Sequence, residues 1–209
     1  MVDTQPVTPP KVTTLITHNL IMSALTEVLK EIEKLANFEK FFWRSQLTQS
    51  KIDEILGEYP FQLSEEVYEL YLWQNGATTN SSEENYESLD FINLGSNPKF
   101  LPLEEAMDIW KNKNQYSNLN ESSKIFPLFN DEYGAIVVLG REEQERVSPV
   151  YIANGGWSIA SLGTPSFPSI TNMILAASEV RSLNGIDDEA AMCEAYNCIE
   201  KKYGGIRAW

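Results

Sequence analysis

Apolar side chains recur at three- and four-residue steps near the start of the chain. The repeat runs from Leu25 to Ala36, and charged residues fill most of the positions between. This spacing gathers the apolar side chains on one face of an α-helix. We therefore predict an amphipathic N-terminal helix, preceded by a flexible, proline- and threonine-rich lead over residues 1–11.

Two shorter helices are predicted next, and each follows a residue that can cap it. Thr48 precedes one helical repeat, and Ser64 precedes the run EEVYELYLW. Hydroxyl side chains accept hydrogen bonds from the first amides of a helix, and acidic residues in the first turn favour its positive end. Asn75 and Gly76 follow the second helix. We expect Gly76 to take a left-handed conformation at the C′ position.

The middle of the chain carries the patterns of strands. The predicted strand segments are 91–95, 100–103, 125–129, 135–139, 149–153 and 157–162. The run GAIVVLG is apolar at consecutive positions, which indicates an inner strand. Short turns between the later segments favour an antiparallel arrangement. Helices are predicted at 104–110, 167–183 and 187–203, so the expected class is α+β: an antiparallel sheet of about five or six strands flanked by helices.

The balance of charge limits the kind of partner. The chain has 16 basic and 30 acidic residues, a formal net charge of −14. Nucleic acids and anionic lipids are bound through basic side chains, so neither is an expected partner, whereas a basic protein is compatible. The sequence also lacks a run approaching the ~20 apolar residues of a membrane span, and its start lacks a signal-peptide core. We expect a cytoplasmic protein without a membrane partner.

Residue types that carry catalysis are sparse. The one histidine, His18, has no second metal ligand or nucleophile near it in the sequence. Cys193 and Cys198 form no disulfide framework, and we interpret them as small apolar residues of the last helix. Phosphate-binding glycine motifs and calcium-loop spacing are absent. We therefore predict neither metal, cofactor nor enzymatic activity, with a carboxylate-based hydrolase as a weaker alternative.

Acidic and tyrosine side chains gather in two polar segments, the loop 77–90 and the turn 130–134. Acidic groups steer a basic partner, and tyrosines often anchor interfaces. Solvated surface is the alternative interpretation of both segments. The candidate partner-binding residues are Glu83, Glu84, Tyr86, Glu87, Asp90, Asp131, Glu132 and Tyr133.

Four runs in this order resemble the SUKH superfamily, which includes yeast cell-wall regulators linked to killer-toxin resistance. They are LSEEVYELYLWQNG, FLPLEEAMDIW, IFPLFNDEYGAIVVLG and SFPSITNMILAASE. Ser64 stands where the family usually has proline, and Ala77 where a further glycine is usual. The resemblance divides the chain into a flexible lead (1–11), an N-terminal helical extension (12–47), a SUKH-like domain (48–181) and a C-terminal helical extension (182–209).

The resemblance implies an α+β domain that binds protein and does not catalyse a reaction. Many bacterial members are similar to immunity proteins, which neutralise a cognate toxin, often a nuclease. A nuclease presents positive charge to its phosphate substrate, so a strongly acidic inhibitor is compatible with this role. The leading hypothesis is an immunity protein, and the alternative is a regulatory scaffold that binds several partners. The resemblance leaves open whether the protein is a monomer or a dimer.

Overall fold

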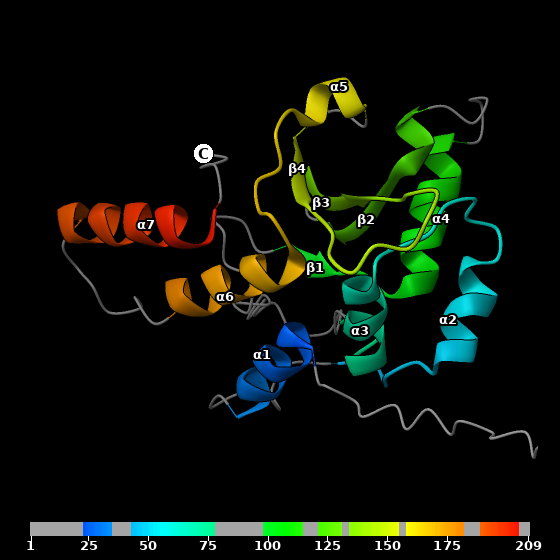
Figure 1. Cartoon of the computed structure of the whole chain (residues 1–209), viewed down its shortest axis with the longest axis horizontal. Coiled ribbons are helices and arrows are strands. Elements are labelled where there is room, and N and C mark those ends of the chain that lie inside the picture. The colour runs from blue at the N-terminus through cyan, green and yellow to red at the C-terminus, as the bar shows by residue number, and fades with distance from the viewer. Residues whose placement is uncertain are drawn as a thin grey trace, which may run out of the picture.

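The computed structural model describes residues 23–34, 43–77, 98–114, 121–130, 134–154, 158–181 and 189–204. Within these residues the chain forms one antiparallel sheet of four strands in the order β1-β2-β3-β4, with helices packed around it (Figure 1). The strands are β1 (Lys99–Phe100), β2 (Ile125–Asn130), β3 (Gly134–Leu139) and β4 (Val150–Asn154). The predicted α+β class is confirmed, and β3 is an inner strand, as its continuous apolar run indicated.

Among the described residues, six helices occur in the predicted order along the chain, and α5 and η3 were not predicted as helices. The described helices are α1 (Ala24–Glu33), α2 (Gln49–Leu56), α3 (Glu65–Trp73), α4 (Leu103–Asn114), the 3-10 helix η3 (Glu121–Lys124), α5 (Ile159–Leu162), α6 (Ile170–Arg181) and α7 (Glu189–Tyr203). Thr48 caps α2 as expected, since its side chain accepts a hydrogen bond from the amide of Lys51. The capping residues therefore located the helix starts well.

The sheet of the described residues has four strands, fewer than the five or six predicted. Residues 159–162, expected to be strand, form helix α5 because Ser158 and Ser161 make a reciprocal capping box. β1 is only two residues long, and α4 begins three residues after it and runs on to Asn114, into a stretch expected to be loop. The predicted strand 91–95 lies outside the described residues.

The main core lies between one face of the sheet and helices α1, α2, α3, α4 and α6. From the sheet, Phe126 and Val138 belong to this core. From α1 come Leu25, Leu29 and Ile32, at the spacing that predicted the helix. The opposite face of the sheet carries a smaller apolar cluster, which α5 joins.

Helix α1 is tied to α3 at both its ends. At its start, the hydroxyls of Ser23 and Thr26 donate to the carboxylate of Glu69. At its end, Nε1 of Trp73 donates to Oε1 of Glu33 over 2.7 Å. A carboxylate beside the first turn also favours the positive end of the helix dipole. The N-terminal helix is thus held by polar contacts as well as by its buried apolar face.

The two cysteines differ from their expected packing. Cys193 and Cys198 are both exposed on α7, so their interpretation as packed apolar residues was wrong. The apolar stripe of α7 instead runs through Tyr196, Ile199 and Tyr203, at three- and four-residue steps. The cysteines are five positions apart, which places them on different flanks of this stripe.

Candidate partner-binding site

The eight candidate residues lie outside the part of the chain that the structure describes, but their flanking residues lie within it. Lys99, shortly after the acidic loop, pairs with Asn130, the residue before the β2–β3 turn. Gly134, the residue after that turn, pairs with Asn154 at the end of β4. The strand register therefore brings the flanks of the loop and of the turn to the same end of the sheet, which we call the Asn130 end.

The two flanks of the acidic loop are also held together. The amide of Ala77 donates to the carbonyl of Phe100 over 3.0 Å, and Ala77 pairs with Trp43 on its other side. Arg44 donates its amide to the carbonyl of Gly76 over 3.0 Å. The chain therefore leaves α3 and returns at β1 beside the same backbone segment, so Ala77 and Phe100 lie at neighbouring positions.

Gly76 fixes the start of this loop. Its φ of +75° is left-handed, as predicted, and a Cβ there would lie 2.3 Å from the backbone nitrogen of Pro102. The predicted C′ position was wrong, because α3 ends at Trp73 and its C-cap is Gln74, in extended conformation. Gly76 is therefore required by the close approach of the Pro102 backbone as well as by its own dihedral angle.

Asn75 links the end of α3 to the start of α4. Its Oδ1 accepts the amide of Leu103 over 2.8 Å, and its Nδ2 donates to Glu104 over 3.1 Å. Asn75 is buried, and its side chain satisfies an amide in the first turn of α4, which has no earlier partner within its own helix. The Asn-Gly pair thus sets the geometry between α3, α4 and the loop that separates them.

At the opposite end of the sheet lies Glu66, a buried acidic residue whose structural role the sequence analysis did not predict. Glu66 has an exposed fraction of 4% and accepts four hydrogen bonds. The amides of Ser148 and Ile170 donate to its Oε2 over 3.0 and 3.1 Å. The amide and hydroxyl of Thr171 donate to its Oε1 over 3.1 and 2.6 Å. Glu66 therefore joins α3, the β3–β4 connection and α6.

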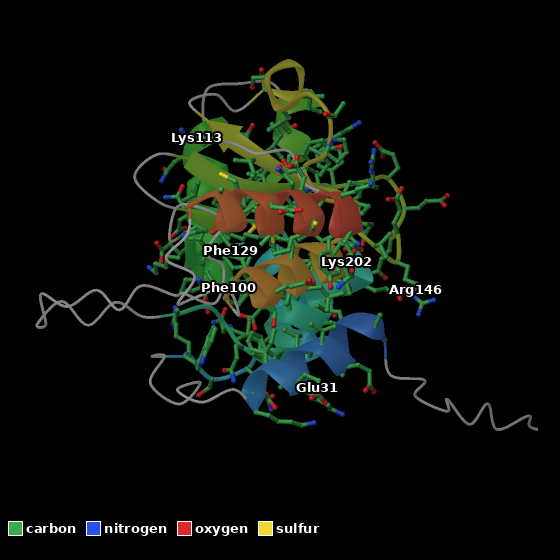
Figure 2. All side chains as sticks on the ribbon, turned by 90° about the vertical axis from the view of Figure 1, so that its left-hand side faces the viewer. Glu31, Phe100, Lys113, Phe129, Arg146 and Lys202 are labelled. Carbon is green, nitrogen blue, oxygen red and sulfur yellow. The ribbon has the colours of Figure 1, made fainter. Side chains whose placement is uncertain are left out.

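These bonds form part of a chain of helix caps. The side chain of Ser64 makes no capping bond to α3; the carbonyls of Glu145 and Arg146 accept the amides of Glu65 and Glu66 instead. Glu66 in turn accepts the first amides of α6. Figure 2 shows the side chain of Arg146 pointing away from the body of the molecule. We call these contacts, from the carbonyls of Glu145 and Arg146 through Glu66 to the first amides of α6, the Glu66 relay.

A sequence signal for the relay exists. Glu66 precedes Leu70 by four residues, and Leu70 is fully buried, so both side chains lie on one helix face. An acid on the apolar face of a helix needs a partner that donates hydrogen bonds. The sequence does not reveal those donors, because Ser148 and Thr171 lie far along the chain.

The buried tyrosines are structural. Tyr59 donates its hydroxyl to the carbonyl of Lys124 over 2.7 Å, and Tyr71 donates to the carbonyl of Leu101 over 3.3 Å. Burial raises the pKa of both phenols, so they stay protonated donors at neutral pH. Among the described residues no group of three acidic, histidine or cysteine side chains could hold a metal ion.

Comparison with known proteins adds no relative. A scan against protein-family models gives no match, and a search of curated proteins gives none either. The resemblance to the SUKH superfamily therefore rests on the four sequence runs alone. In the described part of the chain, no helix is long and apolar enough to cross a membrane.

Proposed function

We propose that this chain is a non-enzymatic immunity protein that binds and neutralises a basic toxin with the segments at the Asn130 end of the sheet. The observation that supports the proposal is the pairing of Lys99 with Asn130, which brings the start of β1, nine residues after Asp90, beside the residue before the β2–β3 turn. The net charge of −14 and the order of the four SUKH-like runs support it. The finer proposal of a SUKH-like fold rests on the same runs, and the proposed cytoplasmic location rests on the apolar pattern of the sequence.

The acidic residues and the tyrosines of these two segments have different roles in the proposed binding. Glu83, Glu84 and Glu87 provide long-range attraction, which speeds the encounter with a basic partner. Tyr86 and Tyr133 provide apolar area together with a hydroxyl, the combination that anchors interfaces once water is excluded. Lys99, the nearby described cation, is paired with Glu105 over 2.9 Å, so its charge is offset locally.

A matched control lies at the other end of the sheet. Glu142, Glu143 and Glu145 are exposed in the connection that joins the far ends of β3 and β4. Replacing these three acids by glutamine changes the net charge as much as replacing Glu83, Glu84 and Glu87. The two triple variants therefore separate the position of the charge from its amount.

The test is protection of growing cells. The chain is expressed in bacteria together with the toxin domain encoded beside its own gene, and growth is compared with cells that lack the chain. We expect full protection by the wild type and by the 142/143/145 control, and reduced protection by the 83/84/87 variant. Equal protection by both variants would move the interface away from the Asn130 end. Failure of the wild type to protect, despite soluble expression, would favour the regulatory scaffold.

A further inference from the structure

Helix α7 is attached to the molecule through one narrow stripe. Of its described side chains only Ile199 is buried, with Tyr196 and Tyr203 half-buried against the same core cluster. Exposed residues, among them Cys193 and Cys198, flank this stripe. α7 lies at the outside of the molecule beside α6 in both views (Figures 1 and 2). It is therefore a peripheral helix with little apolar area to hold it.

Polar contacts hold the C-terminal end of α7 to the rest of the molecule. Nδ2 of Asn172 donates to the carbonyl of Tyr203 over 3.3 Å, and Lys202 pairs with Glu179 over 2.8 Å. Gly204 follows in a left-handed conformation, and a Cβ there would lie 2.9 Å from the ring of Pro168. Hydrogen bonding to Lys202, and then to Tyr203, lowers the pKa of Glu179. The Lys202 and Glu179 side chains are 58% and 37% exposed, so salt screens this pair.

Helix α6, by contrast, is held from several sides. Ile170, Met173 and Ile174 are fully buried in the main core, and α6 packs against both α1 and α3. The first amides of α6 are bound by Glu66. Asn172 and Glu179 share one face of α6, and Ala176 lies between them on that face. This face is the one that α7 covers.

We propose that α7 is a strap, by which we mean a helix that detaches from α6 and unfolds as one unit. The rest of the described fold stays intact during this opening. An isolated helix of 15 residues is marginal in water, so α7 loses its structure once its stripe leaves α6. Among the described side chains, this opening removes one isoleucine and two half-buried tyrosines from the core, and it breaks the Asn172–Tyr203 hydrogen bond and an exposed ion pair. Local openings of this kind lie at the low end of the stability range of a protein. Opening uncovers the Asn172–Glu179 face of α6.

The test is native-state hydrogen exchange of the full chain, followed by mass spectrometry of peptides from α3, α6 and α7. We expect the amides of α7 to exchange as a group, roughly a hundredfold faster than those of α6, yet slower than unprotected amides. Ile199→Ala should speed exchange in α7 at least about tenfold, with α6 unchanged. Cys198→Ser, the neighbouring exposed position, is the matched control and should leave both helices unchanged.

A second variant keeps the test informative if Ile199→Ala disturbs the whole fold. Lys202→Gln removes the exposed ion pair with Glu179 and the contact of Nζ with the Tyr203 ring, and exchange in α7 should rise about two- to threefold, as it should for the wild type at high salt. Equal exchange rates in α6 and α7 of the wild type would overturn the proposal, because the two helices would then open together. Unprotected rates in α7 would overturn it as well, because a strap is docked most of the time.

Discussion

The two ends of the sheet use acidic residues in opposite ways. At one end, Glu66 is buried and each of its oxygens accepts two hydrogen bonds, so it connects three parts of the fold. The candidate acids near the Asn130 end lie outside the described residues, and the sequence predicts them in polar segments. An acid whose bonding capacity is filled by the protein stabilises the fold and has little left for a partner. The comparison teaches that Glu66 stabilises the fold, whereas the acids that we propose for binding are different residues of the same chain.

The largest effect is expected at the relay. Glu66→Ala leaves buried amides of Ser148, Ile170 and Thr171 without their acceptor, and such groups are costly to bury unpaired. We expect the free energy of unfolding to fall by about 3 kcal/mol or more, measured by urea denaturation. Glu65→Ala, at the exposed neighbouring position, should change it by less than about 0.5 kcal/mol. Equal effects of the two variants would show that the relay is not a stabilising unit.

The second-largest effect on stability is expected at Gly76, at the start of the acidic loop. Gly76→Val combines a left-handed φ with a Cβ that would overlap the backbone of Pro102, so we expect a loss of about 2 kcal/mol and a lower midpoint of thermal unfolding. Gly57→Ala is the control, because Gly57 has a right-handed helical φ of −57°. It should leave the midpoint nearly unchanged. An unchanged midpoint for Gly76→Val would mean that the chain leaves α3 by another path.

Local patterns predicted most of the fold, and long-range contacts account for what they missed. The spacing of Leu25, Leu29 and Ile32 predicted α1, and the apolar run of β3 predicted an inner strand. Helix α5 was mistaken for a strand because the sequence Asn154-Gly155-Gly156 before it is typical of a hairpin turn, whereas the Ser158–Ser161 capping box fixes a helical turn. The sequence patterns used for these predictions compare only residues that lie close together in the sequence.

The candidate site was less predictable than the fold. Its residues were chosen by composition, and no pattern in the sequence showed that Lys99 and Asn130 pair, since that register depends on distant strands. The role of Glu66 was missed for a similar reason. Its donor at Ser148 lies 82 residues away in sequence, and its donor at Thr171 lies 105 residues away. Sequence reasoning located acids but could not separate the structural one from the candidates for binding.

A smaller effect is expected for the anchor at the Asn130 end. Tyr133→Ala removes an aromatic contact that forms only after docking, so the dissociation rate from the cognate toxin domain should rise about tenfold while the association rate stays near that of the wild type. Surface plasmon resonance measures both rates. Tyr151→Phe, in the apolar cluster on the far side of the sheet, is the control and should change neither rate. An altered association rate alone for Tyr133→Ala would contradict its role as an anchor.

The most direct test of the account is the salt dependence of association for the two triple glutamine variants. At low salt, replacement of Glu83, Glu84 and Glu87 should slow association with the cognate toxin domain about fivefold, with little change in dissociation. The difference should shrink as salt shortens the Debye length to ~8 Å at physiological ionic strength. The variant at Glu142, Glu143 and Glu145 should associate at nearly the wild-type rate. Equal rates for both variants at low salt would contradict the claim that binding resides at the Asn130 end.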